Sequence, residues 1–244
     1  MKKLYYDLHM HSCLSPCADN DMTPANIAGM GAVAKLDIMA LTDHNTCKNC
    51  PAFFKAAEKY NIVPVAGMEL TTAEDIHLIC LFPELENALG FSEEINSRRV
   101  LIKNNTGIFG DQLIMNENDE VTGSDEYILP NATSVSVDEA PGLAGKYSGI
   151  CYPAHIDRQS NGIIAVLGVF PDEPEFPCFE IHDEEKTDEY KERFPVLRSM
   201  PAVVSSDAHY LWDINGREHS FEFKADRNDA PAVRRELIER LSGR

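Results

Sequence analysis

The sequence predicts an α/β fold built around a parallel sheet, and three observations predict it. Short apolar runs alternate with helical patterns along much of the 244-residue chain. Strand, helix and strand in that order imply right-handed βαβ units, whose strands are parallel. Several of the apolar runs also end on His, Asp or Glu, and the carboxyl ends of parallel strands form one face, where ligands bind.

The apolar runs have the length and composition of β-strands. They span residues 2–11, 36–44, 61–70, 75–82, 149–155, 178–183 and 201–209. Together they supply enough strands for a barrel or for an open sheet.

Helical patterns separate the first three runs. In residues 23–36, Thr23 suits an N-cap, Pro24 suits the first helical position, and apolar residues then recur at helical spacing. Residues 51–60 begin in the same way, and residues 229–244 predict a closing amphipathic helix.

The stretch from about residue 84 to residue 148 is different. It is rich in Asn, Asp, Glu and Gly, and it separates the fourth run from the fifth by far more than an ordinary connection. We expect it to carry helices and a lid-like excursion. Because no internal repeat, heptad pattern or low-complexity tract appears, the sequence predicts a single domain over residues 1–244.

Charge and composition narrow the functional classes. The chain has 40 acidic and 22 basic residues, a formal charge of −18, which repels a polyphosphate backbone and disfavours long nucleic acid as a partner. The N-terminus leads directly into strand-like sequence, and no apolar window reaches the length of a membrane span. We therefore expect a cytoplasmic protein without membrane contact; the sequence does not indicate its oligomeric state.

Metal-capable residues gather at the predicted strand ends. They are His9, His11, Asp43, His44, Glu69, His77, His155, Asp207 and His209. A single histidine in such a place is most often satisfied by one hydrogen bond in the core. The set favours a metal site, because the H-x-H and D-x-H pairs have the period of two that points both side chains to one face.

Imidazoles with carboxylates suit Zn, Mn or Fe. A carboxylate can bridge two cations whereas a neutral imidazole ligates one, so many histidines around Glu69 indicate a cluster of two or three divalent ions bridged by Glu69. Paired cations lower the pKa of a bridging water and stabilise charge on phosphoryl oxygens, so no side-chain nucleophile is required.

Six segments in order along the chain resemble the PHP family, the polymerase and histidinol phosphatase superfamily. They are DLHMHS, LDIMALTDHN, GMEL, IHLICLF, YPAHIDR and SSDAH, from residue 7 to residue 209. The resemblance implies a distorted (β/α)7 TIM-like barrel with the metal site at the C-terminal ends of its strands. It also implies hydrolysis of phosphoesters.

The resemblance further implies a ligand set. The first metal ion would be held by His9, His11, Glu69 and Asp207. The second would share Glu69 and add His77 and His155. The third would use His44, His209 and a carboxylate, for which Asp19 stands at the family's distance from the helix start and Asp21 stands closer. The segment SCLSPCA lengthens the gap after His11 relative to the common family pattern.

Three further residues are candidates for the reaction. Asp43, in the TDH triplet, is expected to orient a neighbouring ligand. Arg158 follows a ligand candidate by three residues and can grip a phosphate with two hydrogen bonds, although a surface ion pair is an equally good interpretation. His182 lies at another strand end and could protonate the leaving group.

The cysteines support a hypothesis of another class. The seven thiols, in a chain without a signal peptide, are expected to be reduced. Cys13 with Cys17 and Cys47 with Cys50 nevertheless have spacings typical of a zinc knuckle, so a thiolate metal site or redox sensor is possible beside the simpler interpretation of four reduced loop cysteines.

The sequence therefore predicts a metal-dependent phosphoesterase acting on a small phosphorylated metabolite or nucleotide. The alternatives are a nuclease acting on short oligonucleotides and a non-catalytic regulatory domain that binds metal or senses redox state.

Overall fold

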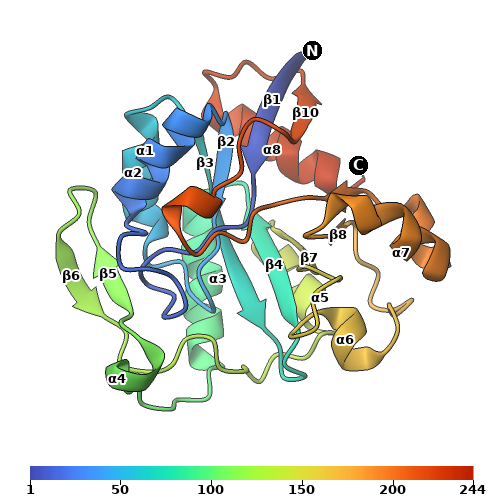
Figure 1. Cartoon of the computed structure of the whole chain (residues 1–244), viewed down its shortest axis with the longest axis horizontal. Coiled ribbons are helices and arrows are strands. Elements are labelled where there is room, and N and C mark those ends of the chain that lie inside the picture. The colour runs from blue at the N-terminus through green and yellow to red at the C-terminus, as the bar shows by residue number, and fades with distance from the viewer. Residues whose placement is uncertain (244) are drawn as a thin grey trace.

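The computed structural model describes residues 1–243, and they form a mixed α/β fold around a twisted sheet of six strands (Figure 1). The strand order is β10-β1-β2-β3-β4-β7. These strands are β1 (Lys2–Asp7), β2 (Ile38–Leu41), β3 (Val63–Thr71), β4 (His77–Phe82), β7 (Ile150–Pro153) and β10 (Ser220–Phe223). A second sheet consists of β8 (Phe179–Glu180) and β9 (Ala202–Val203), which are parallel to each other.

The main sheet is mixed, so the expectation of a parallel sheet is only partly right. Strands β1, β2 and β3 are parallel, but β4 is antiparallel to both β3 and β7, and β10 is antiparallel to β1. The reason is the connection after β3. Residues 72–76 form a tight turn, in which Thr72 N donates to Ile76 O at 2.9 Å, and a parallel strand would need a crossover of a dozen or more residues.

Helices cover one face of the sheet (Figure 1). They are α1 (Pro24–Ala34), α2 (Cys50–Glu58), α3 (Leu85–Ser97) and α5 (Ala140–Lys146). The other face packs against α8 (Ala230–Leu241), whose Val233, Leu237 and Leu241 are buried. Met39 contributes to the first core and its neighbour Ile38 to the second, which is the alternation expected of a strand buried on both sides.

The predicted start of the first helix is confirmed. Thr23 is the N-cap of α1 and accepts a hydrogen bond from Asn26 N at 3.2 Å, with Pro24 in the first turn. The helix ends at Lys35, whose backbone is left-handed at φ 59°. These caps determine where the chain turns back into β2.

The segment 84–148 contains α3, the short helix α4 (Thr106–Phe109), a hairpin of β5 (Leu113–Met115) and β6 (Val121–Ser124), and α5. The hairpin lies beside α2 (Figure 1), where Met115 N donates to Asn49 Oδ1 at 2.9 Å. Buried Arg99 holds the same segment through Asp125, with Nη–Oδ distances of 3.0 and 3.1 Å. The segment is therefore anchored to the body of the fold.

The expected (β/α)7 barrel is seen only in part, because the main sheet and the β8-β9 sheet of residues 1–243 are separate and do not form one closed ring. Single hydrogen bonds connect the two sheets. Ile156 N donates to Glu180 O at 2.9 Å, and His11 N donates to Ala208 O at 3.0 Å. The remaining helices, α6 (Ile163–Leu167) and α7 (Thr187–Arg193), follow β7 and β8.

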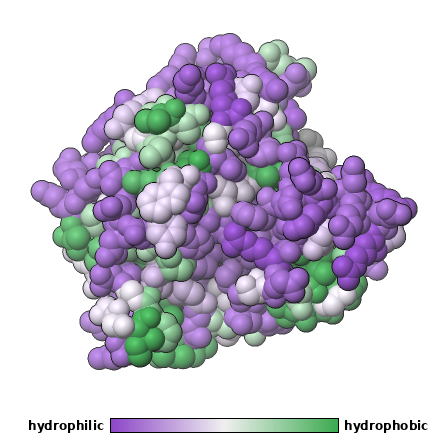
Figure 2. Space-filling view, viewed as in Figure 1, coloured by the Kyte–Doolittle hydropathy of each residue, from purple (hydrophilic) through white to green (hydrophobic). Residues whose placement is uncertain are grey.

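The surface in Figure 2 is largely hydrophilic, with hydrophobic patches near its lower edge over α4 and α6. Exposed side chains there include Ile108 and Phe109 of α4 and Val166 and Leu167 of α6. No helix within residues 1–243 has both the length and the apolar character needed to cross a membrane.

Candidate metal centre

The predicted ligands meet at one rim of the fold. His9 and His11 follow β1, His44 follows β2, Glu69 lies in β3, His155 follows β7, and Asp207 and His209 follow β9. His77 reaches the same rim by another route. The sequence predicts it at the end of a strand, but it is the first residue of β4. Because β4 is antiparallel, its amino end lies beside the end of β3, where His77 pairs with Thr71.

Glu69 is at the centre of this rim. Its carboxylate oxygens lie within 3.5 Å of a ring nitrogen of five histidines: His9 (3.5 Å), His11 (3.2 Å), His44 (3.1 Å), His77 (2.8 Å) and His155 (3.0 Å). Glu69 itself is 1% exposed. A buried carboxylate with this many imidazoles around both oxygens has the arrangement needed to bridge two cations.

Asp207 reaches the cluster from the loop after β9, which pairs with the chain at Met10 and His11. Its Oδ1 lies 3.2 Å from Nε2 of both His9 and His11. One ligand atom from each of His9, His11, Glu69 and Asp207 lies within 4.8 Å of the other three, and a second such group comprises His44, Glu69 and His77.

The side chains of the cluster shift one another's pKa values. Burial alone would raise the pKa of Glu69, but the neighbouring histidines, His77 first, hold it well below its usual range. Burial alone would lower the pKa of His11, but Asp207 and Glu69 outweigh it and raise that pKa to about 9. For His209 burial prevails, and with repulsion from His11 it lowers the pKa to about 4.

These side chains fit divalent metal ions. All the donors are carboxylate oxygens or imidazole nitrogens, which suit Zn, Mn and Fe, and most of them are buried. Three polar atoms of the rim are buried without a hydrogen-bond partner among residues 1–243: His44 Nδ1, His155 Nδ1 and Glu180 Oε2. Buried polar groups are normally paired. Unpaired polar atoms beside a cluster of metal-binding side chains therefore fit a site that binds a further group, such as a metal ion.

Residues 7–122 match the sequence model of the PHP domain. The resemblance to the PHP family is therefore confirmed over these residues, which are 116 of the 244 in the chain. The match covers all candidate ligands up to His77, and no curated protein matches the chain.

Solved structures share this fold at low identity. Endonuclease Q from Pyrococcus furiosus superposes with a TM-score of 0.67 at 18% identity, over 99% of this chain and 56% of that one. A candidate metal-dependent phosphoesterase from Bifidobacterium adolescentis gives 0.60 at 16% identity, over 98% of both chains. An endonuclease Q complex gives 0.58 at 17% identity, over 86% of this chain and 50% of that one. This chain therefore spans about half the length of the endonuclease Q chains that it matches.

The expectation that long nucleic acid is disfavoured as a partner is wrong. The endonuclease Q complex, which shares this fold, holds a 27-mer duplex with an abasic lesion at its active site. Net charge averages over a whole surface, whereas binding depends on the local field and on bound cations. The charge of −18 thus excludes no class of phosphoester.

Asp43 does not face Glu69. It is buried and accepts hydrogen bonds from Ser12 N (2.7 Å), Ser12 Oγ (2.6 Å) and Ser15 Oγ (2.7 Å). Ser15 Oγ in turn lies 3.1 Å from His11 Nδ1. Asp43 is thus placed to orient His11 through Ser15, as metal-ligating histidines usually require.

Sequence reasoning missed Glu180. Its Oε1 lies 2.8 Å from His9 Nδ1 and accepts a hydrogen bond from His155 N at 3.1 Å, and the residue is 1% exposed. It therefore positions two candidate ligands from β8. The signal was available in the segment CFEIHD, where a glutamate alternates with apolar residues inside a predicted strand.

Arg158 and His182 lie at the edge of the cluster. Arg158 Nη1 contacts Asp207 Oδ2 at 2.6 Å, and Arg158 Nη2 lies 3.5 Å from His182 Nδ1. Both side chains line a cavity of about 980 Å³ that also reaches Cys17, Asp207 and His209. This cavity opens onto the rim that carries the candidate metal ligands.

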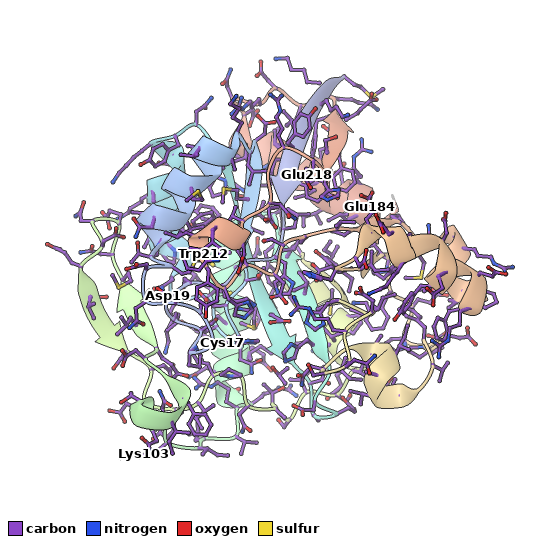
Figure 3. The ribbon with its side chains drawn as sticks, viewed as in Figure 1. Cys17, Asp19, Lys103, Glu184, Trp212 and Glu218 are labelled. Carbon is purple, nitrogen blue, oxygen red and sulfur yellow. The ribbon has the colours of Figure 1, made fainter. Side chains whose placement is uncertain are left out.

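Asp19 is not brought to the metal-facing rim. Its Oδ1 accepts a hydrogen bond from Asp21 N at 2.8 Å within its own loop, and neither acidic residue belongs to a candidate ligand group of the described chain. Cys17 lies near it on the same face (Figure 3) and does belong to such a group.

The four-cysteine site is not formed in the part of the chain that the structure describes. Cys13, Cys47 and Cys50 are buried and belong to no candidate ligand group. Their sulfur atoms contact backbone carbonyl oxygens; for example, Cys47 Sγ lies 3.1 Å from Gly67 O. These three thiols have the contacts of core residues.

Proposed function

We propose that this PHP-domain protein hydrolyses phosphoesters with divalent metal ions held at its rim. The observation that supports the proposal is the buried Glu69 carboxylate, which has five imidazoles within 3.5 Å. Metal ions bound there would lower the pKa of a water to generate the nucleophile and would stabilise charge on the phosphoryl oxygens.

The proposed ligands form two sets that share the Glu69 carboxylate. His9, His11 and Asp207 would share one ion with Glu69, in agreement with their mutual distances. His77 and His155, both nearest to Glu69 Oε1, would hold a second ion. Glu69 would then serve both ions.

Arg158 and His182 are proposed to act on the substrate from the cavity wall. Arg158 is about one third exposed and already pairs with Asp207, so a phosphate at the rim could take up its remaining N–H groups. His182 is exposed beside it and could donate a proton to the leaving oxygen.

The substrate class we propose is a phosphoester that carries a nucleobase, either a nucleotide or a nucleic acid strand. Tyr210 directly follows His209, and its ring stacks on Trp212 with a centroid distance of 4.9 Å and an angle of 13°. Trp212 is 76% and Tyr210 40% exposed, and Tyr210 lines the cavity. An exposed aromatic pair beside a phosphoesterase site offers a surface on which bases stack, worth about 1–3 kcal/mol per base.

The fold neighbours agree with both substrate sizes. Endonuclease Q is a lesion-specific endonuclease, and the Bifidobacterium adolescentis protein is a candidate phosphoesterase of similar length to this chain. The alternative substrate is a phosphorylated metabolite without a nucleobase. Such a substrate would make no use of the aromatic pair of Tyr210 and Trp212, so a test of that pair distinguishes the two substrate classes.

The first test is elemental analysis combined with hydrolysis assays. The panel would contain p-nitrophenyl phosphate, its diester, nucleoside monophosphates, oligonucleotides and a duplex with an abasic site, each with Mn, Zn or Fe(II). We expect two or three metal ions per chain and turnover that His9→Ala abolishes. Metal without turnover on any phosphoester would favour a regulatory domain, and a chain that binds no metal would refute the proposal.

The second test uses Trp212, the only tryptophan in the chain. Its fluorescence should be quenched by nucleoside monophosphates and by oligonucleotides but not by ribose 5-phosphate. Tyr210→Ala should weaken that binding, whereas Tyr60→Ala, which removes another exposed tyrosine at 48% exposure, should not. Equal quenching by the sugar phosphate would contradict base stacking.

A further inference from the structure

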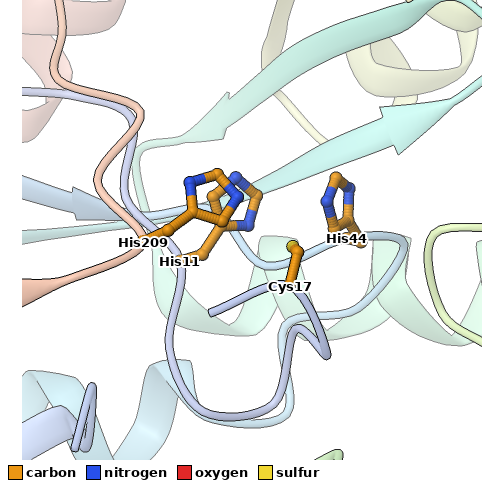
Figure 4. A group of neighbouring side chains, drawn as sticks. All are labelled: His11, Cys17, His44 and His209. Carbon is orange, nitrogen blue, oxygen red and sulfur yellow. The ribbon is translucent and has the colours of Figure 1, made fainter. Parts of the chain in front are cut away.

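Cys17 lies inside a group of histidines at the metal-facing rim. Its Sγ and one ring nitrogen from each of His11, His44 and His209 lie within 4.8 Å of one another. Figure 4 shows the Cys17 side chain directed toward the imidazoles, which come from three separate loops of the fold. A thiol surrounded by three imidazoles has the composition of a transition-metal site.

Backbone contacts hold Cys17 in this position. Ala18 N donates to Ser15 O at 2.9 Å, and Asp19 N donates to His209 O at 2.9 Å, so hydrogen bonds on both sides of Cys17 restrain its loop. His44 is tied to the same loop, because its N–H donates to Ser15 Oγ at 3.1 Å. The loop that carries the Cys17 thiol is therefore fixed to the rim by hydrogen bonds.

One histidine of the group has a ring nitrogen without a hydrogen-bond partner among the described residues. His11 Nε2 is engaged with Glu69 and Asp207, whereas His44 Nδ1, in a residue 4% exposed, has no hydrogen-bond partner among residues 1–243. His44 Nδ1 does lie 3.1 Å from Glu69 Oε2, but without hydrogen-bond geometry. His44 belongs both to the Cys17 group and to the group of Glu69 and His77, and its buried, unpaired nitrogen is a second indication of a ligand.

Asp19, the carboxylate expected for the third metal position, is engaged elsewhere. Its side chain accepts from Asp21 N at 2.8 Å, and its own N–H is bonded to His209 O. The chain thus turns a carboxylate into the loop and leaves the Cys17 thiol facing His44 and His209.

We infer that Cys17 is a metal ligand and that, with His44 and His209, it forms a thiolate site beside the Glu69 cluster which selects zinc or ferrous iron over manganese. The inference rests on the proposed function only in treating the neighbouring cluster as metal-binding. Thiolate is a soft ligand that suits Zn and Fe, whereas an all-oxygen and nitrogen set also accepts Mn. Three protein ligands leave a coordination position open toward the cavity, as in catalytic zinc sites.

The Cys17 thiol is accessible to reagents, so its role as a metal ligand can be measured. All seven cysteines lie within residues 1–243, and Cys17 alone among them is exposed. It also lines the cavity of about 980 Å³. A thiol reagent should therefore modify Cys17 first in the folded protein.

The decisive experiment loads the metal-stripped full chain with Co(II) and records its absorption spectrum. We expect a thiolate-to-cobalt charge-transfer band that Cys17→Ser abolishes, with one fewer ion per chain. Asp19→Asn, the matched control on the same loop, should keep both the band and the ion. Cys17→Asp should restore the ion without the band and should shift the preference toward manganese.

A second measurement follows alkylation of Cys17 by iodoacetamide, located by peptide mass. At free zinc about ten times the dissociation constant of the site, alkylation should slow about tenfold. Manganese at the same concentration should protect less.

The outcomes separate this inference from the phosphoesterase proposal. A cobalt-loaded protein without the band, a Cys17→Ser variant with an unchanged ion count, or an Asp19→Asn variant that loses the ion would each overturn the thiolate site, whatever the turnover. Conversely, the band with no hydrolysis of any phosphoester would support the site and refute only the proposed activity.

Discussion

The two halves of the rim are built differently. In the first half, residues 7–122, the candidate ligands lie on or next to strands of the main sheet, and the nine residues of β3 that carry Glu69 are all buried. In the second half, residues 150–223, strands β8 and β9 have only two residues each. There His155 and Asp207 have positive backbone φ angles of 26° and 51°.

Positive φ is costly for residues other than glycine, and such residues persist where surrounding contacts determine them, often at functional sites. The contacts are present here. His155 N donates to Glu180 Oε1 at 3.1 Å, and Ser206 N donates to the buried Asp7 Oδ1 at 3.0 Å. The comparison shows that a regular ladder positions ligands in one half, whereas hydrogen-bonded loops with strained backbone position them in the other.

The largest expected effect tests the two carboxylates of the centre against each other. Glu69→Gln should reduce kcat on the order of 10³-fold or more, because it removes charge from both proposed ions. Asp207→Asn should lower activity less and should release one ion only. Metal content and single-turnover rates measure this difference, and equal losses in the two variants would contradict the bridging role of Glu69.

The next effect concerns Glu180, which lies in the second half and contacts His9 of the first half and His155 of the second. Glu180→Gln should weaken metal binding about 10–100-fold, since it weakens the contact that holds His9 Nδ1. Glu184→Gln is the matched control, because Glu184 lines the same cavity without contacting a proposed ligand. Competition with a chelator of known affinity measures the metal affinity of both variants. Similar metal affinities for Glu180→Gln and Glu184→Gln would show that Glu180 does not support the site.

A stability effect of intermediate size tests the connection between the two halves, where Asp125 pairs with Arg99 and Lys48 of the first half. Burial raises the pKa of Asp125, but hydrogen bonds from Arg99 and Lys48 outweigh it and hold that pKa below its usual value. Asp125→Asn should lower the free energy of unfolding by about 2 kcal/mol, less than for a fully buried pair because Lys48 is partly exposed.

The pH dependence of this difference has a definite sign. A carboxyl with a lowered folded-state pKa contributes stability above its unfolded pKa, near 3.8, and loses it as the pH falls through the lower folded-state pKa. The gap between the wild type and Asp125→Asn should therefore narrow below about pH 4 in urea denaturation. A gap that widens in acid would contradict the ion pair.

The smallest effect isolates backbone strain. In metal-free protein, Asp207→Gly should be more stable than Asp207→Ala by about 1 kcal/mol, because only glycine tolerates positive φ without cost. At the neighbouring Ser206, whose φ is not positive, the order should reverse. Thermal unfolding of the four variants measures both differences, and the same order at both positions would exclude strain at Asp207.

The sequence by itself determined the α/β class, the start of the first helix at Thr23, and most of the residues at the rim. Periodicity carries this information, because H-x-H and D-x-H spacing points side chains to one side whatever the surrounding fold. It also placed Glu69 among the histidines, although its central contacts appear only in the folded chain.

Tertiary structure alone decided the direction of β4, the choice between Asp19 and Cys17, and the part played by Glu180. A strand has the same period of two in either direction, so the pattern around His77 could not show which end of β4 would reach the rim. Asp19 and Cys17 are two residues apart in one loop, and hydrogen bonds to Asp21 N and His209 O determine which side chain faces the imidazoles. Such bonds join residues far apart in the sequence, and local pattern does not encode them.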